Sequence, residues 1–272
     1  MRSQWESLLQ NLGVWQGSFT VFSPQGELKE DIPSRLTLET LDDTQSTVRL
    51  TLLREGKNDL VLDTSSLSRS LLFFENGAFS QGAMQFSPYG DFGGEFSFIH
   101  ENRRLRFVQL FNNQSNLSTL TLIREHREGT TPDERPPLQV ESLLGEWEGE
   151  GITIYPDLRS PVSFDSKMQL KLDKHQRLIQ NTYFGSEKMI ASTATINGSI
   201  LDFDDNPENP FQVMMLPDGA SATFPVKAQL RQPLFLEAGW LIEPNLRQRI
   251  IRTYDNKGEW VSLTLVTEKK VS

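Results

Sequence analysis

The feature that most constrains the fold is an internal repeat. Residues 6–9 read Glu-Ser-Leu-Leu and residues 13–17 read Gly-Val-Trp-Gln-Gly, and both patterns return at 141–149 as Glu-Ser-Leu-Leu-Gly-Glu-Trp-Glu-Gly. Trp15 and Trp147 are 132 residues apart, whereas the similar closing segments 120–125 and 263–268 are 143 apart. The second copy is therefore 11 residues longer, and the repeat predicts two related units in tandem.

The two copies meet in a proline-rich stretch at residues 129–138. Three prolines among few apolar side chains disfavour a continuing strand or helix there: Pro132, Pro136 and Pro137. The sequence thus predicts an N-terminal domain at 1–128, a linker at 129–138 and a C-terminal domain at 139–272.

Each copy opens with a short amphipathic segment and continues in short β-rich runs. Trp5, Leu8, Leu9 and Leu12 lie three or four residues apart, which is typical of a helix. Turn signals such as Asn197-Gly198 separate the runs that follow. The predicted strands include 34–41, 46–53, 104–111, 117–124, 167–172, 178–184 and 261–267. Many short strands joined by hairpins predict an all-β barrel or sandwich.

Charge and composition narrow the class of protein. The net charge is −9, and one short basic run, at Arg103, Arg104 and Arg106, is interpreted as a strand start with exposed charges, so nucleic-acid binding is not expected. Cysteine is absent and the apolar runs are too short to cross a membrane, so we expect a cytoplasmic protein without membrane insertion.

The sequence contains none of the common catalytic or metal-binding motifs. No phosphate loop, nucleophile elbow or zinc-protease motif occurs, and His100, His126 and His175 are far apart in sequence. The acidic segment 202–213 resembles a calcium loop but has Pro207 where glycine is required and Val213 where a bidentate glutamate is required. We therefore expect no metal and no cofactor, and a function other than catalysis.

Candidate binding residues gather in the second copy. Glu237 lies beside arginines expected on the neighbouring strand, which predicts a buried ion pair that belongs either to the core or to a polar pocket. The predicted ligand or partner site comprises Glu237, Trp240, Arg249, Arg252 and Tyr254. The polar loop at 202–210 is its expected lid or docking surface.

The Gly-x-Trp-x-Gly element resembles the opening of calycins, the superfamily of lipocalin-like barrels. The resemblance implies a short helix at each barrel floor, with Trp15 and Trp147 buried there as structural residues. It also implies that a basic residue of the last strand packs across the tryptophan, and Arg124 matches that position for Trp15. The second copy has Thr267 at the aligned place, so Lys269 or a residue of another strand is expected beside Trp147. A β-sandwich with a coincidental tryptophan is the alternative.

The whole chain resembles a cyanobacterial and plastid double-calycin family of unknown function. The resemblance rests on the runs at 216–219, 236–241, 248–255 and 258–264. It implies two tandem antiparallel lipocalin-like β-barrels, each opened by a short helix. Since a plastid relative is the biogenesis factor required for ATP synthase, it also implies a non-enzymatic assembly factor that binds F1 subunits of the soluble head. The alternative is a carrier or modifying protein for a small apolar or tetrapyrrole ligand held in a barrel.

Overall fold

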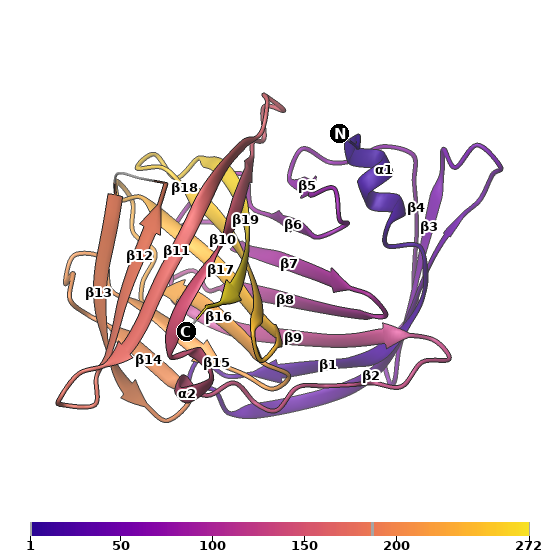
Figure 1. The fold of residues 1–272 in the computed structure, drawn as a ribbon. Coiled ribbons are helices and arrows are strands. Elements are labelled where there is room, and N and C mark those ends of the chain that lie inside the picture. Colours follow the sequence, from indigo (N-terminus) through magenta and orange to yellow (C-terminus); the bar gives the residue numbers. More distant parts are fainter. Residues whose placement is uncertain (1, 186–187, 272) are drawn as a thin grey trace. The chain divides into compact units, whose positions relative to one another are not determined.

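The computed structural model describes residues 2–185 and 188–271, which form two short helices and nineteen strands (Figure 1). The elements of the first half are α1 (Gln4–Leu9), β1 (Gly13–Phe22), β2 (Leu28–Thr40), β3 (Val48–Arg54), β4 (Leu60–Thr64), β5 (Leu71–Phe73), β6 (Phe79–Gly82), β7 (Phe92–His100), β8 (Arg103–Phe111) and β9 (Leu117–Arg127). The elements of the second half are α2 (Val140–Leu143), β10 (Gly145–Ile154), β11 (Val162–Leu172), β12 (Leu178–Phe184), β13 (Lys188–Asn197), β14 (Ile200–Phe203), β15 (Phe211–Met215), β16 (Ala220–Pro225), β17 (Leu234–Glu243), β18 (Leu246–Tyr254) and β19 (Trp260–Lys270).

The first half is one antiparallel sheet of nine strands, in the order β4-β3-β2-β1-β9-β8-β7-β6-β5. No ladder joins β4 to β5 among the described residues, so the sheet stays open at these two edges. The expectation of a closed first barrel was therefore wrong. Strand β5 is only three residues long, and its Phe73 backbone is bound by the side chain of Gln4 in α1, at 2.9 and 2.7 Å. A helix side chain thus takes the hydrogen bonds that a neighbouring strand would provide.

A capping box holds α1 at this place. The Ser3 hydroxyl accepts from the Glu6 amide at 3.2 Å, and the Glu6 carboxylate accepts from the Ser3 amide at 2.7 Å. These bonds satisfy backbone donors that the first turn of a helix leaves free. The helix predicted from Trp5, Leu8 and Leu9 is present.

The second half is a closed barrel of ten antiparallel strands in sequence order, from β10 to β19. Closure comes from β10, which pairs with β11 on one side and with β19 on the other. All nineteen strands are thus accounted for by one open sheet and one closed barrel, and the all-β expectation is confirmed.

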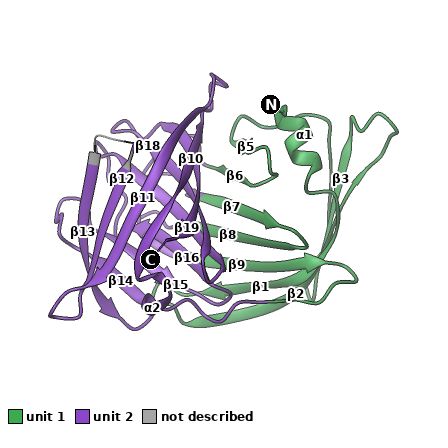
Figure 2. Cartoon of the chain, viewed as in Figure 1, with its two compact units in different colours: residues 1–82, 94–109, 119–133 green, residues 83–93, 110–118, 134–272 purple. Residues whose placement is uncertain are grey.

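Contacts divide the chain into two compact units that differ from the two halves of the sequence (Figure 2). The N-terminal unit comprises residues 1–82, 94–109 and 119–133. The C-terminal unit comprises residues 134–272 together with two earlier segments, 83–93 and 110–118.

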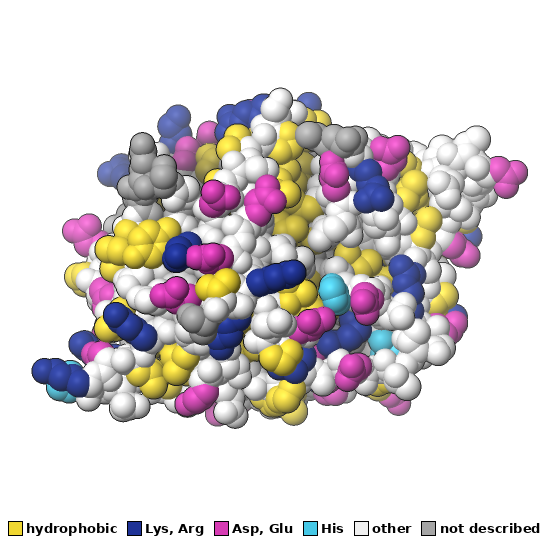
Figure 3. All heavy atoms as spheres, in the orientation of Figure 1, with side chains coloured by type: hydrophobic (Ala, Val, Ile, Leu, Met, Phe, Trp, Pro, Cys, Tyr) yellow, Lys and Arg dark blue, Asp and Glu magenta, His cyan; other side chains and the backbone are white. Residues whose placement is uncertain are grey.

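The described part of the chain contains no helix that combines the length and the apolar character needed to span a membrane. On the face drawn in Figure 3, basic and acidic side chains are interspersed rather than gathered by sign. That face offers no continuous basic surface of the kind that binds a phosphate backbone.

Candidate functional site

Trp15 on β1 and Trp147 on β10 hold equivalent places in the two units. Both side chains are fully buried, and each indole N–H donates to the carbonyl four residues earlier, that of Asn11 at 2.9 Å and that of Leu143 at 2.8 Å. Two residues after each tryptophan, a glycine lies against the neighbouring last strand. A Cβ atom on Gly17 would stand 1.8 Å from the Arg124 carbonyl oxygen, and one on Gly149 would stand 1.9 Å from that of Thr267. The Gly-x-Trp-x-Gly element therefore sets a close approach of two strands.

The cations beside Trp15 do not include the one expected. Arg104 and Arg127 lie over the Trp15 ring, at 4.5 and 4.4 Å from its centroid. Arg127 is the ladder partner of Trp15, so Arg124, three residues earlier on the strand, faces the other side of the sheet. There it donates to the Thr20 hydroxyl at 3.0 Å. The placement of Arg124 across Trp15 was wrong because strand parity excludes it.

Trp147 shows the same arrangement with different residues. The Arg247 guanidinium lies 4.7 Å from the ring centroid and the Lys270 ammonium lies 5.3 Å from it. Lys270 is the ladder partner of Trp147, as Arg127 is of Trp15. Lys269 is therefore not the cation beside Trp147, but the expected alternative, a residue of another strand, is present as Arg247 on β18, and Lys270 of the last strand lies beside it.

Behind Trp15, strands β7, β8 and β9 carry four charged residues that we call the N-terminal charge cluster: Glu95, Arg104, Arg106 and Glu125. Glu125 accepts from Arg104 at 2.7 Å and from Arg106 at 2.9 and 3.0 Å, and Arg106 also binds Glu95 at 2.9 Å. Arg104 is 2% exposed and Arg106 is 8% exposed. The interpretation of this basic run as exposed charges was therefore wrong.

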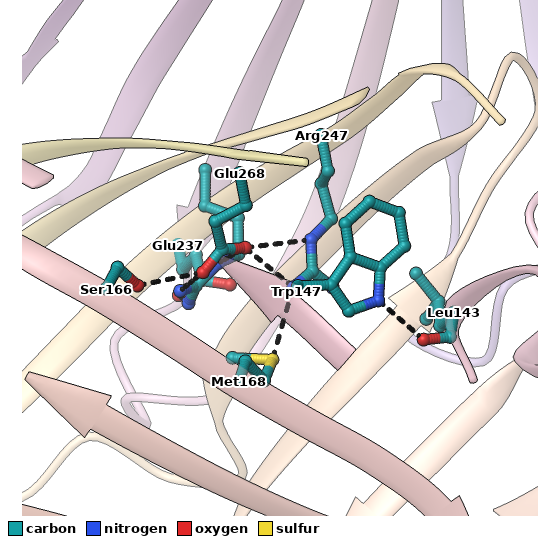
Figure 4. A network of polar contacts seen from close by, with 8 residues as sticks. Leu143, Trp147, Ser166, Met168, Glu237, Arg247 and Glu268 are labelled. Atoms are coloured by element: carbon teal, nitrogen blue, oxygen red, sulfur yellow. Dashed lines mark hydrogen bonds and ion pairs between the residues drawn. The ribbon is translucent and has the colours of Figure 1, made fainter. Parts of the chain in front are cut away.

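The C-terminal charge cluster repeats this network on β17, β18 and β19 (Figure 4). Its members are Glu237, Arg247, Arg249 and Glu268. Arg247 binds Glu268 at 2.7 Å, and Arg249 binds Glu268 at 3.0 Å and Glu237 at 3.3 Å. Ser166 adds a bond of 2.9 Å to Glu268. The expected ion pair between Glu237 and Arg249 is present.

The arginines decide the protonation of the central carboxylates. Burial alone would raise the pKa of Glu125, but attraction to Arg104 and Arg106 outweighs it and lowers the pKa to about 2. The same balance with Arg249 and Arg247 holds the pKa of Glu268 well below its ordinary value. Both carboxylates are therefore ionised and hydrogen-bonded to arginine at neutral pH. Their lowered pKa makes each of them a weak base, poorly suited to general base catalysis.

Glu237 differs from these two carboxylates. Its burial raises its pKa above the ordinary value, and the attraction of Arg249 and Arg247 offsets only part of that effect. Arg249 in turn is held mainly by Glu268, which it meets through two nitrogen atoms.

Arg252 and Tyr254 do not join Glu237. Arg252 pairs with Leu236 in the ladder, whereas Glu237 pairs with Ile251, so Arg252 lies on the opposite face of the sheet. There Arg252 and Tyr254 both donate to the Ala83 carbonyl, at 3.0 and 2.9 Å, and Arg252 lies 3.5 Å from the Trp260 ring centroid. The predicted set of five residues is thus divided between two faces.

Trp240 lies three residues after Glu237 on β17, so by strand alternation it shares the face of Arg252 and not that of Glu237. It is fully buried and pairs with Gln248 and Ala220 in the ladder. Arg252 and Tyr254 are fully buried as well, so all three side chains of this face pack inside the protein.

The polar loop expected as a lid is shorter than predicted. Asp202 and Phe203 belong to strand β14, where Asp202 accepts from Gln212 at 2.6 Å. Phe203 stacks on Phe211 with ring centroids 4.5 Å apart, and both rings line the barrel interior.

The charge clusters were missed in the sequence although a signal existed. The spacing of 143 that relates the closing strands also relates Arg104, Arg106 and Glu125 to Arg247, Arg249 and Glu268. Residues that share both the repeat spacing and a charge type are candidates for a duplicated polar network.

The two units differ in the space beside their clusters. The N-terminal unit contains a pocket of about 330 Å³ that Arg104, Arg106 and Glu95 line together with apolar side chains. In the barrel of the C-terminal unit the corresponding cavity is about 90 Å³. Within the described ranges, no three acidic, histidine or cysteine side chains come together to hold a metal ion.

These observations define an all-β protein built from two related units, one an open sheet with a pocket and one a nearly filled closed barrel. Residues 1–130 match the family described as "Domain of unknown function (DUF3598), N-terminal", and residues 134–271 match "Biogenesis factor required for ATP synthase 1, C-terminal domain". The chain belongs to the DUF3598 family, which confirms the resemblance seen in the sequence.

Two solved structures illustrate the range of similarity. A protein of unknown function from the same family, from Nostoc punctiforme, is 59% identical with a TM-score of 0.97 over 100% of both chains. An S-type phycobiliprotein lyase, CPES, from Guillardia theta is 13% identical with a TM-score of 0.36, over 49% of this chain and 90% of the lyase. No curated protein matches the chain.

Proposed function

We propose that the protein is a non-enzymatic assembly factor for the soluble head of ATP synthase, and that it binds F1 subunits. The observation that carries the proposal is the match of residues 134–271, the whole closed barrel, to the C-terminal domain of a biogenesis factor required for ATP synthase. The internal chemistry agrees with a binding role. The arginines of the two charge clusters hold both central carboxylates ionised and hydrogen-bonded, an arrangement that serves architecture better than proton transfer.

The direct test is binding of the full chain to purified F1 β and γ subunits, measured by size-exclusion chromatography and by affinity capture from a cyanobacterial lysate. We expect one of these subunits to co-elute with the protein and to be enriched by it. Failure of both subunits to bind, together with recovery of a different stable partner, would refute the ATP synthase assignment.

A binding role for Glu237, Trp240, Arg249, Arg252 and Tyr254 stays a prediction within this proposal. Substituting Arg249 and Trp240 separately tests it. If subunit binding falls while the melting temperature holds, the residues contribute to the partner site; if each change only unfolds the barrel, they serve its architecture.

A second candidate function, binding of a small apolar ligand, is supported by the pocket of the N-terminal unit. Small-molecule sites have volumes of about 300–1,000 Å³ with a few convergent polar groups. The pocket of about 330 Å³ meets this condition, and the cavity of about 90 Å³ in the C-terminal barrel does not. If ligand binding occurs, we propose that it occurs in the open sheet rather than in the closed barrel.

A further inference from the structure

The pocket of the N-terminal unit lies where the sheet fails to close. Leu62 and Thr64 of edge strand β4 line it on one side, and Leu71 and Phe73 of edge strand β5 line it on the other. Its walls are mostly apolar, whereas the charge cluster contributes guanidinium and carboxylate groups. The site therefore combines an apolar wall with a charged end.

The internal repeat shows what distinguishes this pocket from its counterpart. Leu36 is the ladder partner of Trp15 and Met168 is the ladder partner of Trp147, so the two residues are equivalent. In the C-terminal unit one nitrogen of Arg247, Nη2, donates both to the Met168 sulfur at 3.2 Å and to Glu268 at 2.7 Å. Leucine offers no acceptor at the equivalent place.

Arg104 is the counterpart of Arg247, but in the described part of the chain its Nη2 has neither of the two acceptors that Arg247 Nη2 has. Its Nε donates to Glu125 at 2.7 Å, but its Nη2 is buried and has no acceptor among the described residues. Arg104 lines the pocket and is 2% exposed. A buried donor left unbonded costs about 1–3 kcal/mol, and more when it is charged, so an acceptor in the pocket would be bound favourably.

A second polar atom of the pocket is in the same situation. Asn11 stands four residues before Trp15, where Leu143 stands before Trp147. The Asn11 amide nitrogen donates to the Gly77 carbonyl at 2.9 Å, whereas its Oδ1 is buried without a donor among the residues described. Asn11 also lines the pocket. The N-terminal unit thus has a free donor and a free acceptor where the C-terminal unit has a satisfied arginine and a leucine.

The local charge favours an anionic acceptor. Arg104 and Arg106 line this end of the pocket and are bound to Glu125 and Glu95, and Arg127 is a further cation nearby, on the ring of Trp15 that Arg104 also contacts. A carboxylate oxygen is a stronger acceptor for a guanidinium N–H than a neutral oxygen is.

We propose that this pocket binds a small amphipathic carboxylate, with its apolar body against the leucine-lined wall and a carboxylate oxygen accepting from Arg104 Nη2. Asn11 Oδ1 accepts from a hydroxyl of the ligand or from a water beside the carboxylate. The proposal deepens the second candidate function and rests on it. It is independent of the proposed role in ATP synthase assembly.

Calorimetric titration of the full chain at pH 7.5 with decanoate, decanol and methyl decanoate tests the ligand class. We expect decanoate to bind at least about tenfold more tightly than the alcohol or the ester, a difference of about 1.4 kcal/mol. Equal binding of all three probes would overturn the carboxylate assignment but leave apolar-ligand binding intact. If none of the probes binds, both are overturned.

Exchange of the equivalent residues tests the site itself. Leu36→Met supplies the acceptor that Met168 gives to Arg247, so we expect an affinity for decanoate about tenfold lower, equivalent to about 1.4 kcal/mol, with an unchanged or higher melting temperature. Asn11→Leu should weaken binding in the same direction. Met168→Leu in the other unit is the matched control and should leave decanoate binding unchanged. Equal weakening by Met168→Leu, or none by Leu36→Met, would place the ligand elsewhere.

Discussion

The N-terminal and C-terminal units carry the same buried network on different sheets. In both, two arginines of one strand bind a glutamate of the next strand, and one arginine reaches back to a second glutamate. The sheets differ in closure, since one is open between β4 and β5 and the other is a complete barrel. The network of buried ion pairs therefore forms in an open sheet as well as in a closed barrel.

The differences are concentrated next to the tryptophans. Leu36 and Asn11 leave polar atoms free in the N-terminal unit, whereas Met168 and Leu143 complete the packing in the C-terminal unit. Ser166 also bonds to Glu268, while the hydroxyl of its counterpart Ser34 is buried without a partner among the described residues. The two units thus share the network of ion pairs and differ in the residues that bond to it.

The largest expected effect comes from removing the central carboxylate of either cluster. Glu125→Gln leaves Arg104 without a counter-charge and Glu268→Gln does the same to Arg247, while Arg106 and Arg249 keep only their contacts with Glu95 and Glu237. Breaking a buried ion pair in this way destabilises by about 3–5 kcal/mol. Glu268 should be the more costly of the two because its bond from the Ser166 hydroxyl also changes from a charged acceptor to a neutral one. Urea unfolding followed by circular dichroism measures both, with Glu148→Gln, an exposed glutamate paired with Lys167, as the control. A loss below about 1 kcal/mol would show that the cluster is not structural.

Acid unfolding should reveal the same carboxylates. The pKa of Glu125 and that of Glu268 are lowered in the fold, so their contribution to stability is complete above the ordinary pKa of 4.5 and is lost as the pH falls. For Glu125 the loss runs down to its lowered pKa of about 2, and for Glu268 it also extends well below the ordinary pKa. The free energy of unfolding, measured between pH 6 and pH 2, should decrease steeply below pH 4.5. The decrease should be shallower in Glu125→Gln and in Glu268→Gln, and an unchanged slope in both variants would contradict the assignment.

A smaller effect is expected at the paired glycines. Alanine at Gly17 or Gly149 places a methyl group against a backbone carbonyl, which forces two strands apart at a cost of about 1–3 kcal/mol. Because the distances are nearly the same, the two losses should be similar. Gly90→Ala is the control, since no atom lies within 4 Å of its added Cβ. Thermal melts showing a loss in only one unit would mean that the two strand contacts are not equivalent.

The smallest effect concerns the cations opposite the tryptophans. Arg127→Ala and Lys270→Ala remove one cation–π contact each, worth about 0.5–2 kcal/mol. Arg127 should be the more costly, because it lies closer to its ring and its hydrogen bond to the Leu12 carbonyl, at 2.6 Å, is shorter than that of Lys270 to the Ser142 carbonyl, at 3.2 Å. Chemical unfolding of the two variants beside Arg124→Ala distinguishes these roles. A larger loss for Arg124 than for Arg127 would contradict the observed strand register.

Much of the fold follows from local pattern. The tryptophan element and the closing strands recur in sequence, and the run 178–184 is strand β12 as predicted. The side of the sheet that Arg124 faces could not be read this way, because the motif does not specify the register of β1 against β9. That register places Arg127, not Arg124, opposite Trp15.

The open edges of the first sheet and the burial of Arg104 and Arg106 could also not be predicted from the local sequence pattern. Closure of a sheet depends on whether its two edge strands meet, and the Gln4 contact with β5 joins residues 69 apart in sequence. Likewise, the sequence pattern predicts Arg104 and Arg106 as surface charges, because their counter-charge, Glu125, comes from the adjacent strand. The candidate site was therefore predicted in part, at Glu237 and Arg249. The presence of a matching charge cluster in the N-terminal unit follows from the pairing of the strands.

The grouping of segment 83–93 with the C-terminal unit affects how the chain can fold during synthesis. The Ala83 carbonyl accepts from Arg252 and Tyr254, which lie about 170 positions later, and the Trp260 amide donates to the Met84 carbonyl at 2.9 Å. A ribosome therefore exposes segment 83–93 long before its partners exist. Translation must proceed almost to the end before these groups are satisfied, so a chain cut at the proline-rich junction would leave part of its first half without native contacts.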